Sequence, residues 1–223
     1  MSTAVLGRLV ARARERGLSA TARKLFEDHV WRRSSSVIME YRREWGGGVG
    51  REFEPADGFR YEMVEPGQPV PPLGRFLARR RGDFERMLAD RKVGAFVSDE
   101  EGAFSCLWLS FEDHRDPESR EFYAVAPGEV YHYCWLLDPE KRKSNAALNM
   151  MRYVFAYAKR RGVTRQFGVI DRVNRPSYQI HKRFHYREAG IEVIHLYLLR
   201  TRWTFTRPYK GELGLYANAG RTG

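Results

Sequence analysis

Residues 138–186 decide the fold of this chain. They begin with Asp138-Pro139-Glu140-Lys141-Arg142-Lys143-Ser144-Asn145-Ala146-Ala147-Leu148, and they end with Val173-Asn174-Arg175-Pro176-Ser177-Tyr178-Gln179-Ile180-His181-Lys182-Arg183-Phe184-His185-Tyr186. The pattern predicts that a strand leads into a polar turn, an amphipathic helix, a second strand and a second helix. The turn brings three cations and main-chain N–H groups to a helix N-terminus, which is a favourable place for an anion.

The segments on either side predict the rest of a sheet and its covering helices. On the N-terminal side we expect helices over 4–16 and 19–31, strands over 36–45 and 59–64, a helix over 73–92 interrupted at Gly82-Asp83, and strands over 93–97 and 103–111. On the C-terminal side we expect strands over 129–137, 165–171 and one long strand over 191–205, with helices up to 161 and over 175–186. The strands over 36–45 and 59–64 could pair antiparallel. Gly46-Gly47-Gly48 between them is expected to be a flexible turn, because no Lys-Ser/Thr follows it.

This order of elements indicates an α/β (α+β) fold with a mixed central sheet covered by helices on both faces. We divide the chain into an N-terminal helical appendage with the first strand (residues 1–50), a main domain (51–205) and a loosely packed C-terminal tail (206–223). The appendage could pack on the main domain, touch a membrane surface or dock a partner.

Charge and composition narrow the class of partner. The net charge of +11 predicts an acidic partner, which could be nucleic acid, a phosphorylated cofactor, an acidic carrier protein or an anionic membrane. No apolar run reaches the roughly 18 residues of a membrane span, and arginines interrupt the N-terminal apolar residues, so we expect a cytoplasmic protein. Cys106 and Cys134 lie in apolar runs and are expected to be buried thiols, and their spacing predicts no metal site.

The turn at 142–147 also carries a family resemblance. From about Phe59 to Phe205 the chain resembles the GNAT superfamily of N-acyltransferases, in which a turn of the form Arg/Gln-x-x-Gly-x-Gly/Ala holds the pyrophosphate of acyl-CoA. Asn145 stands where the family usually has Gly, and Asn is the residue other than Gly that best tolerates a positive φ. The resemblance implies that the donor is held by the following residues: Leu136, Leu137, Arg142, Lys143, Ser144, Asn145, Ala146, Ala147, Asn174 and Ser177.

The second motif of the family, Asn-x-x-Ala/Ser-x-x-aliphatic-Tyr-x-Lys-x-Gly-Phe, matches 174–186 in part. His181 stands where many relatives keep a Tyr that protonates the leaving thiolate, and an imidazolium could do the same near pH 7. We therefore expect His181 to be the acid, with Tyr178 as its substitute. His132 is the first candidate for the base, and a water-mediated route through Asp171 is the second. Cys134 could act as a nucleophile, although no His–Cys spacing supports it.

The resemblance implies transfer of an acyl group from acyl-CoA to a primary amine by direct transfer in a ternary complex. Acetyl-CoA is the first expected donor, and no metal is implied. The acceptor could be a small molecule or a peptide, and the chain could form a homodimer. One alternative is a donor carried by an acidic acyl carrier protein. Another is a non-catalytic module of the same fold that binds nucleic acid or an anionic surface.

Overall fold

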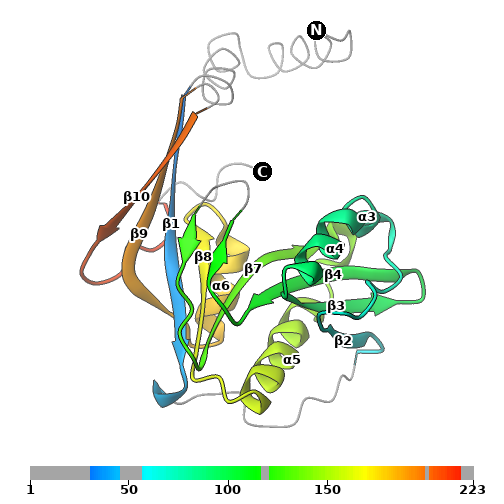
Figure 1. The fold of residues 1–223 in the computed structure, drawn as a ribbon. Helices are drawn as coiled ribbons and strands as arrows, with labels where there is room; N and C mark the ends of the chain where they lie inside the picture. Colours follow the sequence, from blue (N-terminus) through cyan, green and yellow to red (C-terminus); the bar gives the residue numbers. More distant parts are fainter. Residues whose placement is uncertain (1–30, 46–56, 117–120, 199–200, 217–223) are drawn as a thin grey trace, which may run out of the picture.

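An eight-stranded sheet forms the centre of the computed structural model, which describes residues 31–45, 57–116, 121–198 and 201–216 (Figure 1). The strands in spatial order are β10 (Thr201–Pro208), β9 (Arg187–Leu198), β1 (Trp31–Arg42), β8 (Arg165–Asp171), β7 (Glu129–Leu137), β4 (Gly102–Ser110), β3 (Val93–Asp99) and β2 (Arg60–Val64). The β7–β8 pair is parallel and the other neighbouring pairs are antiparallel. The expected helices over 4–16 and 19–31 and the glycine turn at 46–48 lie outside the described residues, apart from Trp31, which belongs to β1.

Helices cover both faces of this sheet, which confirms the expected fold class (Figure 1). The helices α5 (Ala146–Arg160) and α6 (Arg175–Arg183) contribute to a core cluster on one face. The helices α3 (Arg75–Ala78) and α4 (Arg81–Ala89) contribute to a cluster on the other face, where β5 (His114–Arg115) and β6 (Phe122–Tyr123) form a small hairpin. Two 3-10 turns, Arg43–Trp45 and Pro139–Lys141, complete the elements. No helix among the described residues is long and apolar enough to cross a bilayer.

The middle strands are apolar on both sides because both of their faces are covered. Val93, Ala95 and Val97 of β3 join the cluster of α5 and α6, whereas Phe96, between two of them, joins the cluster of α3 and α4 with Trp108. All nine residues of β4 are buried. This is the continuous apolar run that a strand with two covered faces requires.

The first strand lies in the interior of the sheet. β1 pairs with β8 on one side and β9 on the other, and its side chains Val37 and Met39 are completely buried. The prediction that this strand pairs with the one over 59–64 is wrong, since β2 lies at the opposite edge and pairs with β3. The strand that we grouped with the appendage therefore belongs to the same sheet as the main domain.

Two other element predictions need correction. The long strand predicted over 191–205 is two antiparallel strands, β9 and β10, which pair from Leu198↔Thr201 to Ile191↔Pro208. The helix predicted over 73–92 is interrupted at Arg79–Arg80, between α3 and α4, and not at Gly82-Asp83.

The described part of the C-terminal tail is packed, which contradicts the loose tail that we expected. Tyr209, Leu213 and Leu215 are partly buried against the core cluster of α5 and α6. The Arg172 side chain donates hydrogen bonds to the carbonyl groups of Leu213 and Gly214, at 3.1 and 2.8 Å.

Candidate active site

The parallel strands β7 and β8 separate part of the way along their length. Their register covers Glu129↔Arg165, Val130↔Gln166 and Tyr131↔Phe167, yet β7 continues to Leu137 and β8 to Asp171. Beyond these pairs β7 stays with β4 and β8 stays with β1. We call this divergence the β7–β8 split; beyond Tyr131 and Phe167 the two strands are no longer paired with each other.

A β-bulge lies on β7 at the split. Trp108 of β4 is opposite Tyr133, but Cys106, two residues away, is opposite Leu136, so β7 holds one extra residue. Cys134 within the bulge has a φ of 49°, in the left-handed region that non-glycine residues seldom adopt. Cys134 and Trp135 lie in the bulge between these two pairs, and the Cys134 carbonyl accepts a weak contact from the Cys106 thiol at 3.9 Å. Bulges of this kind often lie beside active sites.

The split brings together two histidines that the sequence predicted as site residues. The rings of His132 on β7 and His181 on α6 stack with centroids 5.0 Å apart and an angle of 10° between their planes. Tyr186 meets both rings edge-on, at 5.5 Å and 4.9 Å. A Cβ atom on Gly168 of β8 would lie 2.7 Å from the His132 ring, so glycine leaves the room that the ring occupies.

Burial keeps both imidazoles neutral. It lowers the pKa of His181 to about 4, although a hydrogen bond to the Ser177 carbonyl opposes the shift. Burial, with the nearby His181 as a smaller cause, also lowers the pKa of His132 well below its usual value. The predicted role of His181 as an imidazolium acid therefore does not fit the described state, because the ring carries no charge at pH 7.

Three nitrogen atoms at the split are buried without a hydrogen-bond partner among the described residues. They are Nε2 of His132, Nε2 of His181 and Nε1 of Trp135, whose ring lies 6.0 Å from that of His181. Nδ1 of His181 lies 2.6 Å from the Ser177 carbonyl oxygen, which can only accept, so Nδ1 carries the proton and Nε2 offers a lone pair. Buried polar atoms normally have partners, and three exceptions in one place point to a polar ligand.

The turn that leads from β7 to α5 has the features of an anion site. Ser144 caps it locally, donating to the Lys141 carbonyl and accepting from the Ala146 amide. The amides of Asn145, Ala147 and Leu148 donate no hydrogen bond to a described residue. These N–H groups lie at the positive end of a 15-residue helix.

The cations of this turn differ in their pairing. Lys141 forms an ion pair with Asp99 at 2.7 Å, whereas Arg142 and Lys143 are exposed and form no ion pair with a described residue. Asn145 is exposed and has a φ of −79°, so the expectation that this position needs a positive φ is wrong. The backbone of the residue in the place of the family's Gly is thus not strained.

The other predicted site residues hold the local structure of α6. The Tyr178 hydroxyl donates to Glu188 at 2.8 Å, and the Asp171 carboxylate accepts from the Val173 amide at 3.0 Å. The Asn174 side chain caps α6 by accepting from the Ser177 amide. Leu136 and Leu137 are partly buried at the end of β7. None of these contacts involves the two stacked histidines.

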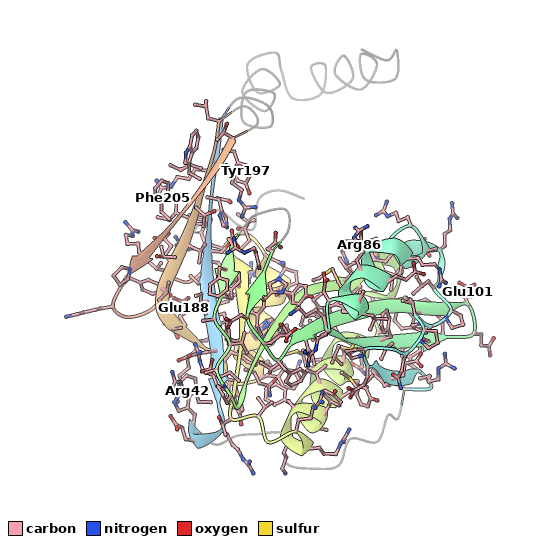
Figure 2. The ribbon with its side chains drawn as sticks, in the orientation of Figure 1. Arg42, Arg86, Glu101, Glu188, Tyr197 and Phe205 are labelled. Atoms are coloured by element: carbon pink, nitrogen blue, oxygen red, sulfur yellow. The ribbon has the colours of Figure 1, made fainter. Side chains whose placement is uncertain are left out.

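Sequence reasoning missed the carboxylate that ties α6 to the tail. Glu188, which is labelled in Figure 2, accepts hydrogen bonds from the Tyr178 and Tyr209 hydroxyls and from the amides of Leu213 and Gly214. Burial alone would raise the pKa of Glu188, but these hydrogen bonds outweigh burial and lower it. The residue holds the C-terminal segment against the helix that carries His181. No motif marks it, because its partners lie 21 to 26 residues away in the sequence, except for Tyr178.

Two surface cavities lie away from the split. One of about 200 Å³ is near the C-terminal end of α5, and one of about 380 Å³ lies between the β5–β6 hairpin and strands β1, β9 and β10. Neither is lined by the 142–147 turn or by the two histidines. Within the described ranges, no group of three or more His, Cys, Asp or Glu residues is arranged to hold a metal ion.

Several solved structures are similar to this chain. A tandem GNAT protein from the clavulanic acid biosynthesis pathway aligns with a TM-score of 0.49 at 12% identity, over 88% of this chain and 59% of that one. GCN5-related N-acetyltransferases from Sphaerobacter thermophilus (TM-score 0.46, 15% identity, 82% of this chain and 57% of that one) and Kribbella flavida (0.44, 13%, 80% and 63%) also align. At these identities the likeness concerns the fold alone, and this chain spans less than two thirds of each. No family model and no curated protein matches the sequence.

Proposed function

We propose that this chain is an N-acyltransferase that moves an acetyl group from acetyl-CoA to a primary amine. The observation that carries the proposal is the β7–β8 split with two neutral imidazoles inside it, each with an unpartnered Nε2 atom. The bulge on β7 at Cys134 and Trp135 lies at the same place.

The residues present fit a CoA thioester at the level of donor chemistry. Arg142, Lys143 and the unpartnered amides at the start of α5 would hold the phosphates. The split follows directly on the N-terminal side of this turn along β7, so a thioester extending from the phosphates would reach it. An N–H group of the bulge at Cys134 and Trp135 would polarise the thioester carbonyl.

The proposed reaction forms one C–N bond and breaks one C–S bond. Nε2 of His181 accepts the proton that the amine nitrogen loses as it attacks, and it returns this proton to the departing CoA sulfur. The atoms balance as amine and thioester to amide and thiol, with no net proton change. His132 supports the ring by stacking, and its own Nε2 is the second candidate acceptor. In this assignment His181 starts neutral and carries the proton from the amine to the sulfur, whereas we expected from the sequence that it would start as a protonated acid.

The test is turnover with acetyl-CoA and a panel of primary amines, followed by mass spectrometry of the amines and by thiol release. Acetylated product should appear with the unchanged chain and with His185→Asn, a control for a histidine that is exposed. His181→Gln should lower kcat by about 10²–10⁴-fold, the usual range for losing an acid–base group. No product with any amine, together with no thermal shift on adding CoA, would overturn the proposal.

The donor site has its own test with a matched charge control. Arg142→Ala/Lys143→Ala removes two cations at the N-terminus of α5, and Lys159→Ala/Arg160→Ala removes two exposed cations at its C-terminal end. The first double variant should weaken CoA binding about tenfold or more, since charge-assisted contacts contribute about 1.5–3 kcal/mol each. The second should leave it within a factor of two to three. An equal loss of CoA affinity in the two double variants would show that the overall charge of the protein, and not this turn, attracts the donor.

A further inference from the structure

Strand β10 is an open edge of the sheet. It pairs with β9 on its inner side, no described strand pairs with its outer side, and it is the outermost strand in Figure 1. Seven of its eight residues are exposed, among them Trp203 at 43% and Phe205 at 52%. Long edge strands with aromatic and β-branched residues are templates for pairing with another strand.

The register identifies which main-chain groups point outward. The Tyr209 amide donates to the Gly190 carbonyl at 2.8 Å, and these two residues are directly opposite in the register that ends at Pro208↔Ile191. Hydrogen-bonded pairs alternate along an antiparallel ladder, so the odd-numbered residues of β10 bond to β9 and the even-numbered residues point to the outer edge. Pro208 has an even number and needs no inward N–H group, which agrees with this assignment.

The outer edge is nearly symmetric about Thr204. Reading outward from this residue, the pairs are Trp203 and Phe205, then Arg202 and Thr206, then Thr201 and Arg207. A twofold axis through Thr204 would place Thr204 opposite Thr204 of a second copy and Arg202 opposite its Thr206. All of these are outward-pointing residues, so every such pair can exchange main-chain hydrogen bonds. Trp203 would lie opposite Phe205 of the copy in a non-hydrogen-bonded pair, where side chains are closest.

The two arginines of the strand do not oppose this pairing. Arg202 donates to Glu121, and Arg207 donates to the buried Glu192, so each charge has a carboxylate partner within its own chain. In the register centred on Thr204 each arginine faces a threonine, and no like charges meet. Charged side chains usually protect edge strands against pairing with another chain. Here both charges are already neutralised by ion pairs within the same chain, so they do not give this protection.

We propose that two copies of this chain associate through β10, in antiparallel register centred on Thr204, to form one continuous sheet with twofold symmetry. Such an interface is self-complementary, as a twofold dimer requires. The proposal is independent of the acyltransferase chemistry, because no residue of β10 lies at the β7–β8 split.

The first test measures mass by analytical ultracentrifugation over a range of concentrations. The full chain should reach twice the mass of one copy. Thr204→Pro removes an outward N–H group, and Thr204→Val is its matched control, because both lose the Thr204 contact with His195 but only proline loses the N–H. The proline variant should be monomeric and the valine variant dimeric, each with unchanged circular dichroism. A monomeric unchanged chain at about 100 μM, where a pairing with Kd near 10⁻⁵ M would be populated, or a dimeric proline variant would overturn the proposal.

The second test fixes the register by oxidation of single cysteines. Thr204→Cys should form a disulfide between copies, since the two Cα atoms would be about 5.5 Å apart, within the range for disulfides. Thr206→Cys faces Arg202 of the copy and should crosslink at least tenfold more slowly. The unchanged chain, with Cys106 and Cys134, measures background. Fast crosslinking through residue 206 and none through 204 would exclude the register.

Discussion

His181 combines burial with a proton on Nδ1, and this makes stability depend on pH. Burial lowers its pKa from 6.5 to about 4, so the unfolded chain binds the proton more readily than the folded one. Stability from this group is present above pH 6.5 and is lost as the pH falls towards 4; the shift corresponds to ~3 kcal/mol. His132 has a lowered pKa from the same cause and acts in the same direction.

We therefore expect the free energy of unfolding, measured with urea, to fall steeply between pH 6.5 and pH 4. His181→Gln should flatten this slope, because glutamine does not titrate. Identical slopes in the unchanged chain and in His181→Gln would contradict the neutral, buried state of the ring.

Gly168 is a second residue whose change has a definite cost. Gly168→Ala would place a methyl group 2.7 Å from the His132 ring and 2.9 Å from the His132 carbonyl oxygen. Because one of these atoms is backbone, β7 and β8 must separate, and we expect a loss of about 1–3 kcal/mol in thermal or urea unfolding. A neutral result would mean that the strands at the split move easily.

At the scale of elements, replacing Gly82 by alanine should stabilise the protein, whereas the same change at Gly168 should destabilise it. It lies in α4, has no atom within 4 Å of an added Cβ, and has no positive φ. Gly82→Ala should raise the free energy of unfolding by about 0.5–1 kcal/mol, because alanine restricts the unfolded chain more than glycine does. A decrease would show that α4 is strained in a way the contacts do not reveal.

The four hydrogen bonds that Glu188 accepts hold the C-terminal tail against α6. Glu188→Ala leaves two tyrosine hydroxyls and two amides without their acceptor. We expect a loss of about 2–4 kcal/mol, and faster amide exchange in α6 and in residues 209–216 than in β3 and β4. Uniform acceleration across the sheet would indicate global destabilisation only.

The elements that sequence predicted well are those with strong periodicity and clear ends. The helix of α5 has an apolar stripe, basic residues near its end and Gly162 after it, and the structure agrees. The break between β9 and β10 was missed, because β-branched and aromatic residues continue on both sides of it without a Gly or Pro. The break between α3 and α4 was placed at glycine, but the chain turns at Arg79–Arg80.

At the scale of the whole molecule, the sequence predicted the fold class and named both histidines of the candidate site, but it did not predict the position of β1. Local patterns identify strands, whereas the neighbours of a strand depend on contacts across more than 100 residues. The same reason applies to the site: His132 and His181 were named separately, but their stacking, and the burial that makes both neutral, follow only from the packing of α6 on the split.

This position of β1 predicts the outcome of truncation. A chain that starts at residue 51 lacks the strand between β8 and β9 and leaves the partners of Val37 and Met39 exposed. We expect no cooperative thermal transition by circular dichroism and rapid proteolysis. A chain that starts at residue 31 keeps β1 and is the control; a folded product from residue 51 would contradict the prediction.

The same arrangement has a consequence for synthesis on the ribosome. β1, the first of the described strands, must find its place between β8 and β9, so about 120 residues follow it before the first of these neighbours is made. Residues 60–137 can assemble their own half of the sheet earlier, while the N-terminal strand waits unpaired. Nascent chains stalled before residue 187 should therefore bind chaperones longer than released chains do. The insertion of β1 between β8 and β9 should occur only when synthesis of the chain is nearly complete.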